Sequence, residues 1–395
     1  MNICHRVQVR SAHVIKGALR ALLCCLITVQ SLWAQPVQLP ASSQLTSPSS
    51  TSSAPEPSAP APSTPEPSTP SSTTPAPSLT VKSQDHAKGF DHMRAWRELT
   101  ALVRRGQRYY GAPRRGEAIA DLMSRLKRAG AKVSHQTFQK VETVSGARFQ
   151  LTNIVGRLMP ERPQRVLLGS HWDTRLWAEE DSDASRREAP IAGANDGSSG
   201  LAVLLEVARQ VDQLSLGHLG VDIVFFDGEE FGRPGSNDYC AGSRHFAEHL
   251  KAYYPEAPPI AVIVIDMVGD QDLAFPPEQS SVVNARALTT LIWREGVRLR
   301  APAFLRGLGL ENPSQPKPAP QGKWIIDDHT PFQKLKIPAT LIIDLEYPQW
   351  HTHQDTLDRV SPQSLLQTGE VLIASLKRLD QLSASQPSRS STPSP

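Results

Sequence analysis

Four short runs of apolar, mostly β-branched residues occur along the chain and predict strands that are buried on both faces. They cover residues 166–170, 221–226, 261–265 and 339–343. Such uninterrupted runs are typical of parallel strands covered by helices, because a strand with one face in water alternates apolar and polar residues.

Amphipathic segments with helical spacing lie around and between these strands. They are predicted at 115–129 before Gly130 as a C-cap, from Ser199 through Val211, from Ser243 as an N-cap to about Lys251, and from Ser361-Pro362 onward. Because strands and helices alternate, the sequence predicts an α/β fold. We expect a single domain with a mixed, mostly parallel central sheet and helices on both faces.

Residues 1–34 have the pattern of an export signal peptide. A basic region comes first, an apolar run from Ala21 to Val29 follows, and the small residue Ala34 provides a cleavage site. The run is too short for a comfortable transmembrane helix, so membrane contact is expected only through an uncleaved signal anchor. The sequence therefore predicts an exported protein, either periplasmic or secreted.

Composition divides the remainder of the chain. Residues 35–87 are rich in Pro, Ser and Thr, and 12 of the 34 prolines lie between positions 35 and 83, so we expect a disordered linker there. The tail 383–395 has the same character, which leaves 88–382 for the folded domain. The formal net charge is only +3 and no basic stretch is interleaved with aromatic residues, so no nucleic-acid partner is expected.

Acidic residues and histidines follow the ends of the predicted strands. They are His171 and Asp173 after the first strand, Glu229 and Glu230 after the second, Asp266 at the end of the third, His351 beyond the fourth, and Asp196 before a helix. The carboxyl ends of parallel strands form one edge of a sheet, so these side chains are expected to meet there. Buried carboxylates need a compensating charge, and oxygen and nitrogen donors without thiolate are typical of a catalytic zinc site.

This ordered set resembles the zinc aminopeptidase family, the M28-like group that also contains the animal-type, zinc-dependent glutaminyl-peptide cyclotransferases. The resemblance extends from about Gly111 to Leu382. Four stretches are similar to the cyclotransferase branch in particular, at 225–230, 242–245, 327–332 and 350–352. The Asp-Asp-His segment at 327–329 and the tryptophan directly before His351 are the most specific of these signals.

The resemblance implies a reaction and a role for each site residue. The enzyme would convert the N-terminal glutamine of peptides or proteins to pyroglutamate and release ammonia, with zinc polarising the γ-carbonyl and Glu229 as general acid/base. The resemblance also implies that one zinc ion is held by Asp196, Glu230 and His351. The catalytic hydrogen-bonding groups near the leaving ammonia would be Asp266 and Asp327. The substrate pocket would be lined by Trp350.

Two other interpretations stay open. In a two-zinc aminopeptidase that hydrolyses N-terminal residues, His171 and Asp266 would become ligands of a second ion and Asp196 would bridge the two. The other interpretation is a non-catalytic binding domain that kept the fold.

The sequence also departs from the animal cyclotransferase pattern, because 341–344 has no histidine and 232–235 has no tryptophan. Part of the expected pocket wall and leaving-group network therefore lacks a counterpart.

Overall fold

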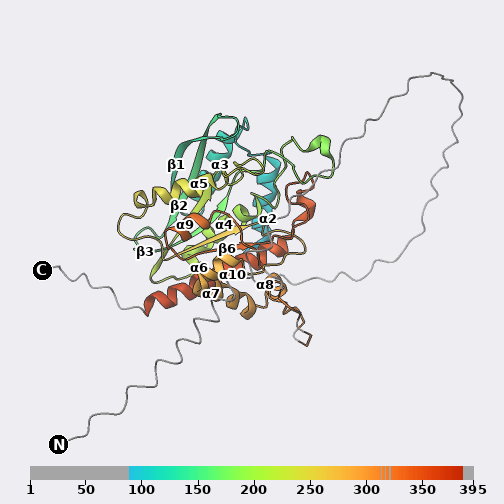
Figure 1. Cartoon of the computed structure of the whole chain (residues 1–395). Coiled ribbons are helices and arrows are strands. Elements are labelled where there is room, and N and C mark those ends of the chain that lie inside the picture. The colour runs from blue at the N-terminus through green and yellow to red at the C-terminus, as the bar shows by residue number, and fades with distance from the viewer. Residues whose placement is uncertain (1–88, 313, 316, 320–321, 386–395) are drawn as a thin grey trace, which may run out of the picture. The chain divides into compact units, whose positions relative to one another are not determined.

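The computed structural model describes residues 89–312, 314–315, 317–319 and 322–385 of the 395-residue chain (Figure 1). The predicted signal peptide at 1–34 and linker at 35–87 lie outside the described residues and stay predictions. Of the predicted tail 383–395, the structure describes only the first three residues, and the last helix continues to Ala384. Within the described ranges, no helix combines the length and apolar character needed to cross a membrane.

One six-stranded sheet forms the centre of the domain (Figure 1). Its strands are β1 (Lys132–Val141), β2 (Arg148–Leu158), β3 (Gln164–His171), β4 (Leu219–Phe226), β5 (Ala261–Asp266) and β6 (Ala339–Ile343). The spatial order is β1-β2-β4-β3-β5-β6, and the strands β4, β3, β5 and β6 run parallel to one another. The strands β1 and β2 pair antiparallel at one edge, and β2 is also antiparallel to β4. The predicted mixed, mostly parallel sheet is confirmed.

Helices cover both faces of this sheet. The described helices are α2 (His92–Arg104), α3 (Arg115–Arg128), α4 (Ser199–Gln210), α5 (Ala241–Glu248), α6 (Gln279–Asn284), α7 (Arg286–Arg298), α8 (Pro302–Gly307), α9 (Thr330–Lys334) and α10 (Pro362–Ala384). Alternate strand residues face two different cores, as the pleat requires. In β3, Val166 and Leu168 belong to the core that includes α4 and α10, whereas Leu167 belongs to the core that includes α5 and α9.

The four strands predicted from apolar runs are present, and each observed strand contains its predicted run. The β1–β2 hairpin was not predicted, because most residues of β1 are partly or fully exposed and polar, and no apolar run marks the strand. At the end of the chain, Ser361 caps α10 by accepting a hydrogen bond from the backbone N–H of Gln363, as its Ser-Pro start predicts.

The predicted start of α5 at Ser243 is wrong. The helix begins at Ala241, and its N-cap is Cys240 in a left-handed conformation with φ of 57°. Backbone hydrogen bonds join the start of the helix to the segment after β4, since the N–H groups of Cys240 and Ala241 donate to the carbonyls of Glu229 and Gly228. The Ser243 hydroxyl instead donates to the Cys240 carbonyl from inside the first turn. Backbone bonds therefore start this helix, and no side-chain cap is used.

Substitution of Leu204 tests whether α4 is the element that joins the sheet to α10. Leu204 is fully buried in the larger core, so Leu204→Ala removes packing and leaves a cavity. We expect the free energy of unfolding to fall by about 2 to 5 kcal/mol in denaturant titration. The matched variant Leu382→Ala, at a leucine that is 42% exposed on α10, is expected to change stability by less than about 0.5 kcal/mol. Equal effects of the two variants would contradict the packing described here.

Candidate active site

The predicted acidic and histidine residues meet at the carboxyl edge of the sheet. His171 is the last residue of β3 and Asp266 the last of β5, and the Nε2 atom of His171 lies 3.0 Å from Oδ1 of Asp266. On the other side of the site, Nε2 of His351 lies 3.3 Å from Oε1 of Glu230. The sheet topology thus brings together residues that are far apart in the sequence, as the sequence analysis expected.

Asp196 lies between these two pairs and gives one oxygen to each. Its Oδ1 atom is 3.2 Å from Nε2 of His171, and its Oδ2 atom is 3.7 Å from Nε2 of His351. Two buried groups of candidate metal ligands result, and they share this one carboxylate: His171, Asp196 and Asp266 in one, and Asp196, Glu230 and His351 in the other. In each group the ligand atoms lie within 4.8 Å of one another.

The charges of the Asp196, Glu230 and His351 group fit a divalent cation. Burial, together with the neighbouring Glu230, raises the pKa of Asp196 well above its usual range. Although burial acts in the opposite direction, Glu230 and Glu179 raise the pKa of His351 to about 10. Both shifts share one cause, which is the negative charge concentrated at this position, and such a position would stabilise a cation. Two carboxylates and an imidazole without thiolate form the donor set of a catalytic zinc site, so the residues fit this ion.

The buried Arg175 and the neighbouring Glu179 form ion pairs with the ligands Glu230 and His351. The Nη1 atom of Arg175 lies 3.2 Å from Oε2 of Glu230, and its Nη2 donates to Glu179 at 2.6 Å. The Nδ1 atom of His351 lies 3.0 Å from Oε1 of Glu179. This ion-pair distance orients the imidazole so that its other nitrogen, Nε2, faces Glu230 and Asp196 in the ligand group. The sequence placed Arg175 and the acidic run 179–183 either at the pocket mouth or in a surface loop, and did not assign them to the ligands, since a charged pair in a loop has no periodic pattern.

Two further aspartates fix the backbone beside the ligands. Asp173 accepts hydrogen bonds from the N–H groups of Glu229 and Glu230, at 3.3 and 3.1 Å. Asp355 accepts in the same way from the N–H groups of Asn195 and Asp196, at 2.8 and 3.2 Å. These carboxylates therefore set the positions of the loops that present the ligands and do not themselves belong to either metal-ligand group.

Glycine is required in the loop that carries Asp196. Gly197 has φ of +88°, and a Cβ atom there would collide with the backbone carbonyl of Asp173. The close approach of the two loops brings the segment of Asp196 against the segment that follows β3. A residue with a side chain at this position would separate them.

Glu229 lines the same cavity as the zinc-ligand group and has an unusual environment for a carboxylate. The Cys240 thiol donates to its Oε1 at 3.3 Å. Burial and the adjacent Glu230 raise the pKa of Glu229 well above its usual range. A raised pKa makes a carboxyl group a better proton acceptor once it is ionised, as a general acid/base requires.

The remaining predicted residues lie on the wall and rim of this cavity, which has a volume of about 540 Å³. Asp266 and Asp327 both line it, and burial together with Asp266 raises the pKa of Asp327 to about 7. Trp350 is 43% exposed and its ring stacks on the His351 ring, with 3.8 Å between centroids. His171 lies outside the cavity lining, buried behind Asp196 and Asp266. The structure thus brings all predicted site residues together, while their individual roles stay predictions.

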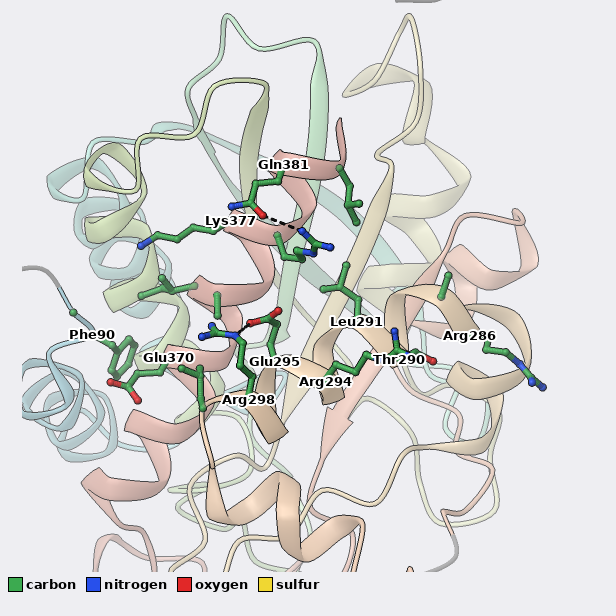
Figure 2. A pocket seen from close by; sticks show the side chains of 17 residues that line it. Phe90, Arg286, Thr290, Leu291, Arg294, Glu295, Arg298, Glu370, Lys377 and Gln381 are labelled. Atoms are coloured by element: carbon green, nitrogen blue, oxygen red, sulfur yellow. Dashed lines mark hydrogen bonds and ion pairs between the residues drawn. The ribbon is translucent and has the colours of Figure 1, made fainter. Parts of the chain in front are cut away.

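A larger groove of about 1280 Å³ lies between α7 and α10 (Figure 2). Its polar side chains include Arg294, Arg298 and Lys377, and it contains none of the predicted site residues. Within the part of the chain that the structure describes, no group of candidate metal ligands lies in this groove. The smaller cavity is therefore the candidate active site.

The sequence model of peptidase family M28 matches residues 153–376, which include every predicted site residue. The chain belongs to peptidase family M28. This family membership agrees with the resemblance drawn from the sequence, and with the α/β fold and the site at the carboxyl edge of its sheet.

Among individual proteins, the chain is similar to a glutaminyl-peptide cyclotransferase of Drosophila melanogaster, with 27% identity over 219 residues. That match spans 51% of this chain and 58% of the relative. The solved structure of Porphyromonas gingivalis glutaminyl cyclase is 30% identical with a TM-score of 0.65, covering 74% of this chain and 100% of that one. A leucine aminopeptidase precursor from Bacteroides thetaiotaomicron is 28% identical with a TM-score of 0.66, covering 73% and 97%.

The contact between Glu179 and His351 leads to a prediction about metal affinity. Glu179→Gln removes the negative charge that lies 3.0 Å from Nδ1 of His351, while it preserves the size of the side chain. We expect zinc affinity to fall by about ten- to a hundredfold, measured by competition with a chromophoric chelator. The control Glu188→Gln changes an exposed glutamate further along the same loop and is expected to bind zinc as the unchanged protein does. Unaltered affinity of the Glu179 variant would show that this pair does not orient the ligand.

Proposed function

We propose that this protein is a glutaminyl-peptide cyclotransferase, which converts the N-terminal glutamine of peptides or proteins to pyroglutamate and releases ammonia. The observation that carries the proposal is the structural match to a bacterial glutaminyl cyclase, which covers that whole chain and 74% of this one. The cavity of this chain also contains the three expected zinc ligands beside Glu229. The Drosophila relative supports the same activity.

The reaction closes a ring within the substrate. The α-amine attacks the γ-carboxamide carbon, the new C–N bond closes the lactam, and the carboxamide nitrogen leaves as ammonia. Because the nucleophile and the electrophile belong to one residue, little entropy is lost when they are brought together. The chain must therefore hold the glutamine in a folded conformation and move one proton from the amine to the leaving nitrogen.

The residues of the cavity are arranged for these tasks. Asp196, Glu230 and His351 would hold one zinc ion, which when bound supplies Lewis-acid polarisation of the γ-carbonyl. Glu229 takes the proton from the attacking amine and delivers it to the departing ammonia, a role that its raised pKa suits. Asp327, which shares the cavity with Glu229, accepts hydrogen bonds from the leaving nitrogen.

The apolar rim of the cavity positions the substrate side chain. Trp350 stacks on the ligand His351 and stays 43% exposed, so one face of its indole is available to the methylene groups of glutamine. Ile325 and Leu345 line the same cavity and give it further apolar surface.

One observation favours a second candidate function. Asp196 gives one oxygen to each ligand group, and this is the arrangement that a carboxylate bridging two ions requires. With a second ion held by His171 and Asp266, the site would suit an aminopeptidase that hydrolyses N-terminal residues. The similarity to an aminopeptidase precursor agrees with that alternative. In the cyclotransferase, His171 instead lies hydrogen-bonded to Asp266, and Asp266 faces the cavity as a hydrogen-bonding group near the leaving ammonia.

The proposed setting is outside the cytoplasm. An export signal at 1–34 and a Pro/Ser/Thr-rich linker at 35–87 support a periplasmic or secreted enzyme that acts on the N-termini of exported peptides and proteins. No nucleic-acid partner is proposed, and membrane contact is limited to a retained signal anchor.

Product analysis separates the two functions. We expect a Gln-initiated peptide to lose the mass of ammonia and remain intact, with ammonia released in equal amount, and one zinc ion in the active site at full activity. Mass spectrometry of the peptide, an ammonia assay and metal analysis of the same preparation provide the three readouts. Free glutamine together with two zinc ions in the active site would overturn the cyclotransferase proposal and establish the aminopeptidase.

Substitution of Glu229 tests the proton-transfer step. Glu229→Gln keeps the shape of the side chain but removes its ability to exchange a proton, so we expect kcat to fall by at least about a hundredfold. Zinc content is expected to stay unchanged, because Glu229 belongs to neither ligand group. Retained turnover with retained zinc would show that another residue carries the proton.

A further inference from the structure

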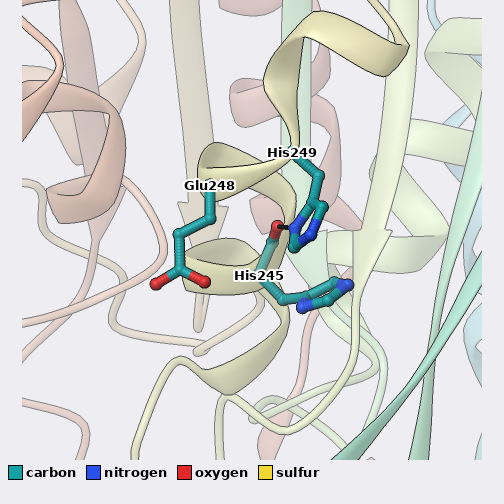
Figure 3. Close-up of side chains that lie close together, drawn as sticks. All are labelled: His245, Glu248 and His249. Atoms are coloured by element: carbon teal, nitrogen blue, oxygen red, sulfur yellow. Dashed lines mark hydrogen bonds between the residues drawn. The ribbon is translucent and has the colours of Figure 1, made fainter.

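A second cluster of metal-binding side chains lies at the C-terminal end of α5. His245, Glu248 and His249 lie within one helical turn there, as Figure 3 shows. None of the three lines the candidate active-site cavity. His245 ends the stretch at 242–245 that is similar to the cyclotransferases, yet the proposed reaction gives this histidine no task.

The spacing of the three residues brings their donor atoms together. Positions three and four residues apart lie on the same face of a helix, so Glu248 and His249 are both neighbours of His245. One donor atom from each side chain lies within 4.8 Å of the other two. The two imidazole rings lie partly over one another, with 4.2 Å between centroids (Figure 3). Glu248 and His249 are exposed, so an ion can reach the cluster from solvent.

Two contacts hold the imidazoles ready for an ion. The Nδ1–H of His249 donates to the backbone carbonyl of His245 at 2.9 Å, and this leaves the Nε2 lone pair of His249 available as a ligand. The His245 ring stacks on Phe138 of β1, with 4.1 Å between centroids and an interplanar angle of 9°. Because both rings are already restrained, less side-chain entropy is lost when an ion binds.

We propose that this turn of α5 binds a divalent transition-metal ion of the Zn²⁺ type, separately from the active site. Two imidazoles and one carboxylate are a donor set that such ions prefer, with water in the positions that remain. Hard ions such as Mg²⁺ and Ca²⁺ are not expected to bind, because they require oxygen ligands. The cluster and the catalytic ligands share no residue, so the two ions bind to the folded chain independently.

Zinc binding to the full chain, measured by equilibrium dialysis at rising free Zn²⁺, tests the proposal. The unchanged protein is expected to take up one zinc equivalent more than a His245→Ala/His249→Ala variant. The single variant His249→Ala, at an exposed position, is expected to lose at least about tenfold in affinity for that equivalent alone. Excess Mg²⁺ should not displace it. Cyclotransferase or peptidase turnover of the single variant should stay unchanged, since His249 belongs to neither catalytic ligand group.

A matched control uses another exposed histidine. His135→Ala on β1 is expected to bind zinc as the unchanged protein does, so a general loss of surface imidazole cannot explain the result. Equal zinc uptake by the unchanged protein and the double variant at every concentration would overturn the proposal. Equal loss in the His135 and His249 variants would also overturn it, because the binding would then be unspecific. Failure of the proposed cyclotransferase activity alone would leave this result unaffected.

Discussion

The candidate active site depends on one buried carboxylate, Asp196, placed between two histidines. Its two oxygens lie 3.2 Å from Nε2 of His171 and 3.7 Å from Nε2 of His351, so this one side chain belongs to both groups of candidate ligands. A buried carboxylate among other carboxylates is unfavourable unless positive charge compensates it. The neighbouring imidazoles can supply part of that charge, and a bound divalent cation would supply the rest. Metal binding at this site is therefore also a contribution to folding stability.

The fold brings the ligands together with few specialised features. Parallel strands place His171 and Asp266 at one edge because both residues end their strands. The loops that follow would be free to move without further contacts. Asp173 and Asp355 prevent this by accepting backbone N–H groups beside Glu230 and Asp196. Positions in the loops are thus fixed by main-chain hydrogen bonds, which do not depend on the conformation of any long side chain.

The sequence was sufficient for those parts of the molecule that follow a period or a family pattern. Apolar runs predicted the central strands, and the strand ends predicted which carboxylates and imidazoles would meet. It was insufficient where pairing is between individual groups. Arg175 and Glu179 hold Glu230 and His351 through ion pairs that leave no periodic signal. The start of α5 at Ala241 was missed because backbone bonds, and not a capping side chain, begin that helix.

The number of metal ions and the identity of the product are one question in this fold. Hydrolysis requires a water molecule to be activated and held in line with the scissile carbonyl, which is the task of a second ion in a two-metal site. Cyclisation requires no such water, because the nucleophile is the substrate's own amine. One ion then suffices, and His171 with Asp266 can remain a hydrogen-bonded pair that fixes one oxygen of Asp196. The ligand residues present are thus compatible with either reaction, and the proposed cyclisation is the one that needs no ion at the His171 group.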